Sequence, residues 1–176
     1  SEKLFQTDEG VEKAKKAAFR LLSGRAYTRW EILEKLKARG FIGPVIDETV
    51  VALEELRLID DADFARRFVQ EKIRLRPMGR PMLKKELKRR GISDPELVEE
   101  VLDDAFTEVD PEELALELLR GLKSRYSSLD RQKALSRMYG FLGRRGFSGS
   151  DARSAVERAW PPVAVVPSCC SRLSAW

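Results

Sequence analysis

The stretch Leu36-Lys-Ala-Arg-Gly-Phe41 decides the fold, because it recurs as Leu87-Lys-Arg-Arg-Gly-Ile92 and as Leu142-Gly-Arg-Arg-Gly-Phe147. The shared pattern is Leu-x-x-Arg-Gly-apolar, and the glycines lie 51 and then 55 residues apart. A glycine at this place ends a helix in a left-handed conformation, and the apolar residue after it folds back onto the leucine. The sequence therefore predicts three helix stops of one kind at similar spacing.

The segments around each stop also repeat. Apolar residues recur three and four positions apart on both sides, as in Ile32, Leu33 and Leu36 before the first stop and Val45 and Ile46 after it. Another such stripe precedes each pair, and this spacing is typical of helices rather than strands. We therefore expect an all-α protein of three tandem three-helix, helix-turn-helix-like repeats. Units near 50 residues are marginal alone, so we expect them to support one another in an elongated, curved array.

The repeats are expected at residues 12–59, 60–108 and 109–160, with an irregular tail at 161–176. Helix-start signals agree with this division. Thr28-Arg-Trp-Glu31 and Ser93-Asp-Pro-Glu96 have the spacing of capping boxes, in which a hydroxyl and a carboxylate satisfy free N–H groups at a helix start. Further starts are indicated by acidic caps and first-turn prolines, at Asp60, Asp61, Asp110 and Asp130 and at Pro44, Pro81, Pro95 and Pro111.

Composition removes most enzyme classes. The chain of 176 residues has no histidine, which excludes Ser-His-Asp and Cys-His catalysis and histidine-bound zinc. Its two cysteines, Cys169 and Cys170, are adjacent, so they can form neither a zinc site alone nor a disulfide framework. The sequence contains neither of the common glycine-rich phosphate loops. We therefore expect no catalytic residue, metal or cofactor.

Two acidic clusters offer the one alternative that includes a metal and catalysis. Asp60-Asp61-Asp63 and Asp103-Asp104 could hold Mg²⁺ as in a nuclease, but helix capping and solubility explain them more simply.

The sequence has no apolar run of the roughly 18 residues needed to cross a membrane. A monomeric cytoplasmic protein is expected.

Charge is segregated along the chain. Residues 66–92 contain 11 basic and 2 acidic residues, 93–117 contain 11 acidic and no basic ones, and 118–176 contain 11 basic and 3 acidic ones. Such blocks indicate either an anionic partner or pairing of opposite blocks within the fold. Lys84 and Lys88, and Lys85 and Arg89, are like charges one helical turn apart, which favours a partner. The predicted binding residues are Arg66, Arg67, Arg74, Arg76, Arg80, Lys84, Lys85, Lys88 and Arg89, with a secondary patch of Arg137, Arg144 and Arg145.

A three-helix unit of this kind could also place a helix in the DNA major groove. The last helices of the first two units are acidic, at Asp47-Glu48 and Glu99-Glu100, and phosphates would repel them. Readout of bases by every unit is therefore disfavoured, whereas contact with single- or double-stranded DNA backbone stays open. Most aromatic residues fit the core stripes, but Tyr27, Trp30 and Tyr126 lie near helix ends and could stack on a base or a partner.

The sequence resembles the RecX family, regulators of the recombinase RecA. The resemblance covers roughly residues 12–160, and its most specific part is Arg76–Ile92, where Gly79 and Glu86-Leu87 accompany the basic run. It is carried by Ala18–Arg25 before Thr28–Leu33, by Leu36–Phe41, by Leu58–Ala65, by Arg76–Ile92 and by Arg144–Phe147. The resemblance implies a non-enzymatic protein that binds the RecA filament on DNA, lies in its groove, and inhibits ATP hydrolysis and strand exchange. The alternative from the residues alone is a stand-alone tandem helix-turn-helix DNA-binding protein.

Overall fold

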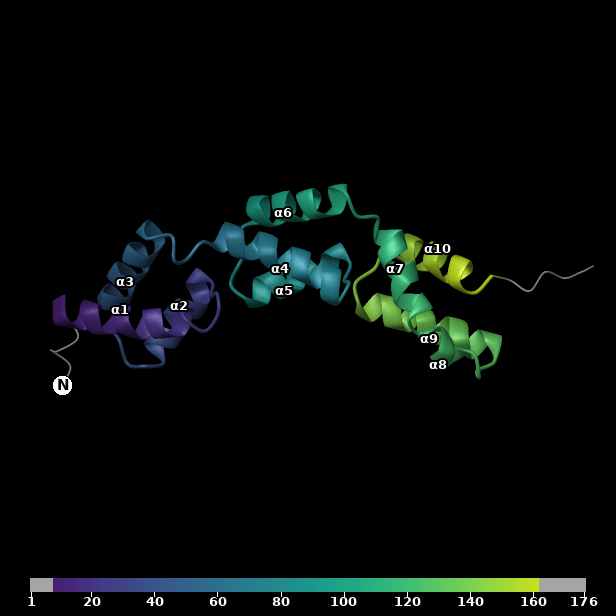
Figure 1. The fold of residues 1–176 in the computed structure, drawn as a ribbon, viewed down its shortest axis with the longest axis horizontal. Helices are drawn as coiled ribbons and strands as arrows, with labels where there is room; N and C mark the ends of the chain where they lie inside the picture. Colours follow the sequence, from purple (N-terminus) through teal and green to yellow (C-terminus); the bar gives the residue numbers. More distant parts are fainter. Residues whose placement is uncertain (1–7, 162–176) are drawn as a thin grey trace, which may run out of the picture.

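The computed structural model describes residues 8–161, so the predicted tail and its two cysteines lie outside it except for Pro161. Within this range the chain forms ten helices and no strand (Figure 1). The first unit consists of α1 (Asp8–Leu22), α2 (Arg29–Lys37) and α3 (Gly43–Glu55), and the second of α4 (Asp61–Leu75), α5 (Arg80–Arg89) and α6 (Pro95–Thr107). The third consists of α7 (Pro111–Arg120), α8 (Lys123–Tyr126), α9 (Arg131–Arg144) and α10 (Gly149–Ala159). The four-residue α8 was not predicted.

Each unit has its own hydrophobic core. The first is built around Ile32, Leu36 and Leu53, the second around Leu83 and Leu87, and the third around Leu119, Met138 and Leu142. The three units follow one another along the long axis of an elongated molecule (Figure 1). The predicted all-α fold of three stacked units is therefore confirmed.

The three helix stops have the predicted geometry. Gly40, Gly91 and Gly146 have φ angles of +84°, +82° and +78°. After each glycine, the next N–H donates to the carbonyl of the repeated leucine, as from Ile92 to Leu87 at 3.1 Å. The leucine is fully buried in all three copies. One sequence pattern thus produces one backbone turn, which returns the chain toward the core of its own unit.

Most helix starts also agree with the sequence, with one correction. Thr28 and Glu31 form the predicted capping box at α2, and the side chains of Asp60, Asp110 and Asp130 cap α4, α7 and α9. The box predicted at Ser93 is wrong, because Asp94 is the cap of α6 and accepts from the Glu96 N–H at 3.1 Å. Pro95 favours the first helical position, which leaves the preceding residue as the cap. A capping box formed by Ser148 and Asp151 was not foreseen.

Candidate interaction surface and the joints between units

Helix α5 carries the centre of the predicted basic surface. Leu83 and Leu87 are fully buried on its inner side, and Lys85, Lys88 and Arg89 are exposed. An apolar stripe that is held inward fixes the direction of the charged residues between its members. The helix thus presents cations outward, as the sequence predicts.

Part of the basic block is paired with the acidic helix α6. Arg66 lies 2.9 Å from Glu100, Arg80 pairs with Asp103, and Lys84 pairs with Glu99. Internal pairing, one of the two interpretations of the charge blocks, thus applies to these three cations. Their side chains are partly exposed, so each pair contributes at most about 1 kcal/mol to stability.

Among the other predicted binding residues of the second unit, some form an ion pair within their own helix and some form none within residues 8–161. Arg67 pairs with Asp63 at 2.8 Å, and Arg89 with Glu86 at 2.8 Å, each on its own helix. By contrast, four exposed cations form no ion pair with any residue in the range 8–161. These are Arg74, Arg76, Lys85 and Lys88.

The secondary patch of the third unit also contains both exposed arginines and an arginine that contacts other parts of the fold. Arg137 and Arg144 are exposed and line an open groove together with Arg125, a residue outside the predicted patch. Arg145 is only partly exposed and is used inside the fold: its guanidinium donates to the Pro77 carbonyl at 3.2 Å and lies 5.2 Å from the centre of the Phe141 ring. Arg145 therefore joins two units in this structure.

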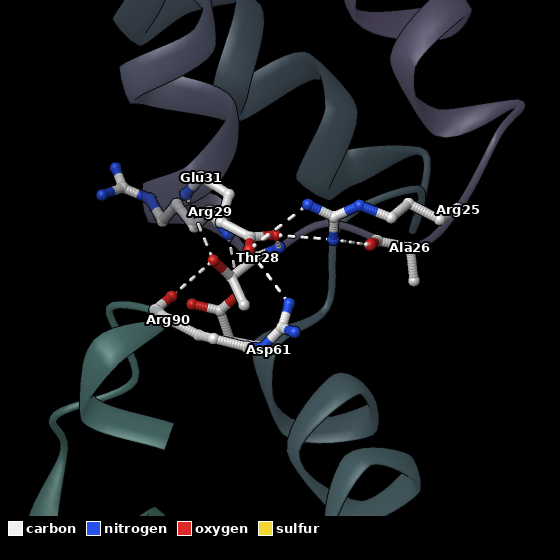
Figure 2. A network of polar contacts seen from close by, with 7 residues as sticks. All are labelled: Arg25, Ala26, Thr28, Arg29, Glu31, Asp61 and Arg90. Atoms are coloured by element: carbon white, nitrogen blue, oxygen red, sulfur yellow. Dashed lines mark hydrogen bonds and ion pairs between the residues drawn. The ribbon is translucent and has the colours of Figure 1, made fainter. Parts of the chain in front are cut away.

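The first joint connects the first and second units through side chains (Figure 2). The buried Thr28 hydroxyl donates to the Arg90 carbonyl at 2.6 Å and accepts from the Glu31 N–H at 3.1 Å. The Arg90 guanidinium returns to Glu31 at 3.0 Å, and Arg25 holds the same carboxylate at 3.1 Å. The capping box of α2 therefore also binds Arg90, the residue that follows α5 and precedes the stop glycine Gly91.

The acidic cluster at the start of α4 belongs to this joint. Asp61 accepts the Arg29 N–H at 2.8 Å, and burial together with nearby Glu54 raises the pKa of this carboxyl. Asp60 caps the helix, and Asp63 pairs with Arg67. No group of three or more potential metal ligands occurs in the part of the chain that the structure describes. Asp60 is thus a helix cap, as the simpler interpretation predicts, whereas Asp61 and Asp63 have partners that it did not specify.

The three aromatic residues near helix ends have different surroundings. Trp30 is 46% exposed as a whole residue, but the Cβ end of its side chain covers Gly91 at the first joint. Tyr27 is stacked by Arg25, whose guanidinium lies 3.7 Å from the ring centre. Tyr126 is buried in the core of the third unit, so stacking on a partner is wrong for this residue.

The second joint, between the second and third units, uses the main chain. The Gly79 N–H donates to the Arg145 carbonyl at 2.9 Å. A Cβ atom on Gly79 would lie 1.9 Å from the Gly146 carbonyl oxygen, and one on Gly146 would lie 2.6 Å from the Met82 Cβ. The sequence singled out Gly79 only through its resemblance to a family. The structure supplies the physical reason, which is the close approach of two backbones.

The comparisons with known proteins agree along the chain. Family models described as the first, second and third three-helix domains of RecX match residues 14–53, 60–102 and 108–156. A regulatory protein RecX from Chlorobium phaeobacteroides is 34% identical over 86% of this chain and 96% of its own length. One from Amycolatopsis mediterranei is 34% identical over 85% of each chain.

Solved structures show the same fold. The crystal structure of RecX from Lactobacillus salivarius has a TM-score of 0.73 at 24% identity, covering 87% of this chain and 98% of that one. A second crystal structure of regulatory protein RecX has a TM-score of 0.72 at 26% identity, covering 85% and 74%. No helix within residues 8–161 is long and apolar enough to cross a membrane. On its sequence matches and its three repeated units, this chain belongs to the RecX family of regulatory proteins.

Proposed function

We propose that this chain is a non-enzymatic negative regulator of the RecA recombinase. It binds the RecA filament on DNA, lies in the filament groove, and inhibits ATP hydrolysis and strand exchange. The observation that carries the proposal is family membership over all three units, since the relatives are named regulatory proteins and the family resemblance implies RecA as the target. We place this activity in the cytoplasm and assign it to a monomer.

The shape and charge of the molecule support this proposal. An elongated array can contact several subunits of a filament at once (Figure 1). A filament of protein on DNA also offers both carboxylates and phosphates to cations that have no internal partner. The binding surface then centres on Arg74, Arg76, Lys85 and Lys88, with Arg137 and Arg144 as its extension into the third unit, while Arg66, Arg67, Arg80, Lys84 and Arg89 contribute from the rim.

A charge reversal on α5 tests the proposal. The variant Lys85→Glu/Lys88→Glu leaves the Lys84–Glu99 pair intact, so it changes only exposed cations that have no ion pair among the described residues. Two reversed contacts should each cost on the order of 0.5–1 kcal/mol, so inhibition of the DNA-stimulated ATPase of RecA should weaken about tenfold. Added salt should weaken the wild type more steeply than the variant, because the variant engages fewer charges.

Lys16→Glu/Lys35→Glu in the first unit is the matched control, since it makes the same charge change at exposed lysines outside the basic block. It should retain inhibition, and circular dichroism should show that both variants fold. A wild-type chain that fails to inhibit RecA would overturn the proposed function. Full inhibition by the folded α5 variant would overturn the assignment of its binding surface.

The alternative, a stand-alone DNA-binding protein, is tested with RecA omitted. The exposed acidic residues of α3 and α6 argue against it, because Asp47, Glu48, Glu99 and Glu100 would meet phosphates if these helices entered the major groove. Tight sequence-specific binding of duplex DNA by the isolated chain would favour this alternative. Weak, salt-sensitive binding without sequence preference would agree with backbone contacts within a filament.

A further inference from the structure

Each joint leaves a groove beside the first helix of the following unit, and the two grooves are equivalent in the repeat. Phe64, Phe68 and Glu71 of α4 line the first groove. The residues 50 positions later line the second, and they are Leu114 and Leu118 of α7 and its C-cap Gly121. The same architecture is therefore present twice with different side chains, so the chemistry of each groove can be compared directly.

The first groove is the smaller of the two and is lined by aromatic and paired charged residues. The rings of Phe64 and Phe68 stack at 6.1 Å, and Arg67 reaches Asp63 across the same helix at 2.8 Å. In the second groove leucines replace the two rings, and Gly121 stands where the first groove has Glu71. The volume rises from about 330 Å³ in the first groove to about 710 Å³ in the second. The second groove is thus large enough to receive several side chains of a partner.

The floor of the second groove is apolar. Leu114, Leu118, Leu122 and Phe141 are partly buried against the core of the third unit, and Ile73 contributes from the second unit. These side chains leave an apolar surface open to water at the place where two units meet. Covering it with aliphatic or aromatic side chains would remove that surface from water, which is favourable.

The rim of the second groove is cationic. Arg74, Arg125 and Arg145 line it, and Glu117 is the acidic residue among its described lining residues. Arg74 and Arg125 are exposed and form no ion pair with other residues in the range 8–161. Guanidinium groups beside an apolar floor match a ligand that has apolar side chains flanked by carboxylates.

We propose that the second groove binds an acidic amphipathic segment of the protein component of the filament. One or two leucine, isoleucine or phenylalanine side chains of that segment cover the apolar floor, and neighbouring aspartate or glutamate residues pair with Arg74 and Arg125. Nucleic acid fits this groove less well, because its floor offers leucines rather than the aromatic faces on which bases stack. The inference rests on the proposed function, since it takes the partner to be RecA.

Two variants of the full chain test the groove. Gly121 has an ordinary helical φ of −64°, and a Cβ there would lie 3.6 Å from the Leu118 carbonyl oxygen, so Gly121→Gln should fill the groove without strain or a change in charge. Arg74→Glu/Arg125→Glu reverses the two free arginines of the rim. Arg153→Glu is the charge control, on an exposed arginine of α10 outside the groove.

Affinity for DNA-free RecA is measured by fluorescence anisotropy of the labelled chain, and affinity for a single-stranded oligonucleotide is measured alongside. Both groove variants should bind RecA at least tenfold more weakly, and Arg153→Glu should stay within about threefold of the wild type. Gly121→Gln should bind the oligonucleotide as the wild type does. Circular dichroism should show that all variants are folded.

The outcomes separate this inference from the proposed function. If the wild type binds RecA and both folded groove variants bind equally well, the groove proposal is overturned and the regulatory function stands. If Gly121→Gln weakens oligonucleotide binding as much as RecA binding, the occupant is nucleic acid and the proposal is overturned.

If the wild type does not bind RecA, the proposed function fails, and the groove is judged with a synthetic probe. This probe is a labelled peptide of alternating Leu-Leu and Glu-Glu pairs, which should bind the wild type and not Gly121→Gln. Equal binding to both proteins would overturn the groove proposal. A shift of the wild type alone toward dimers in sedimentation would assign the groove to a second copy and would also overturn it.

Discussion

The two joints between units place the same elements together with different chemistry. In the first joint, the hydroxyl of the α2 cap, Thr28, donates to the carbonyl of Arg90, the residue before a stop glycine. In the second, the backbone N–H of the α5 cap, Gly79, donates to the carbonyl of Arg145, which is again the residue before a stop glycine. A repeat position can thus be held by a side chain or by the backbone alone. A contact made by side chains can adjust to a substitution, whereas a contact between two backbones, such as that of Gly79 with Gly146, cannot.

The largest expected effect is at the second joint. Gly79→Ala places a methyl group 1.9 Å from a backbone carbonyl oxygen, and no side-chain rotation can relieve this contact. We expect a loss of about 2–4 kcal/mol in unfolding free energy or separation of the third unit from the second, because overpacking against a rigid neighbour forces backbone shifts. Urea denaturation would measure the first outcome and small-angle scattering the second. An unchanged stability and shape would mean that the two backbones are not in contact.

The next effect separates strain at a stop glycine from contact at a joint. In Gly91→Ala, the alanine is strained by the positive φ of this position, and its Cβ would also lie 2.2 Å from the Trp30 Cβ. In Gly40→Ala, the alanine has the same strained backbone, but its Cβ would have no atom within 4 Å. Gly40→Ala should therefore cost only about 1–2 kcal/mol from the left-handed backbone, and Gly91→Ala about 1 kcal/mol more. Thermal unfolding of both variants compares them directly. Equal losses would show that Trp30 moves aside freely.

A smaller effect is expected when the hydroxyl at the first joint is removed. Thr28→Val keeps the shape of a buried side chain but loses both the cap of α2 and the hydrogen bond to Arg90. We expect a loss of about 1–2 kcal/mol in unfolding free energy, which is typical for a cap and a buried hydrogen bond. Thr28→Ser retains the hydroxyl and serves as the control. A valine variant as stable as the serine one would show that packing, rather than hydrogen bonding, holds this joint.

The smallest effect concerns pH at the same joint. The pKa of Asp61 is raised chiefly by burial, so the folded chain holds this proton more tightly than the unfolded chain does. The tighter proton binding increases the free energy of unfolding, and this contribution is complete below the unfolded pKa of about 3.9. The contribution is lost as the pH rises through the folded pKa of Asp61. Asp61→Asn keeps an oxygen to accept the Arg29 N–H. It should be more stable than the wild type at neutral pH by a few tenths of a kcal/mol, after discounting for solvent screening.

Urea titrations at several pH values would measure this difference. The gap between Asp61→Asn and the wild type should narrow as the pH falls through the folded pKa of Asp61. A variant that is less stable than the wild type at neutral pH would show that the charged carboxylate contributes favourably to the joint.

Local sequence patterns were enough to predict the nine longer helices of residues 8–161, the three stops and the number of units. These features depend on residues within one or two turns of each other, such as Leu87, Gly91 and Ile92, so local conformational rules suffice to predict them. The same rules chose the wrong cap where two neighbouring residues could both cap a helix, at Ser93 and Asp94, and they did not reveal the short helix α8 or the capping box at Ser148. The basic character of α5 was also readable, because periodicity alone identifies the face that Leu83 and Leu87 leave exposed.

Long-range packing, by contrast, sets which of the described cations are left without an ion pair and how the units are joined. Lys84 and Lys85 are adjacent in sequence, yet one pairs with Glu99 of α6 and the other has no ion pair within residues 8–161. Gly79 and Gly146 are 67 residues apart, and their contact depends on how one core stacks on the next. Such pairings arise from the packing of whole helices, which a one-dimensional pattern of charges and apolar residues does not specify. The joints and their grooves therefore became visible only in three dimensions.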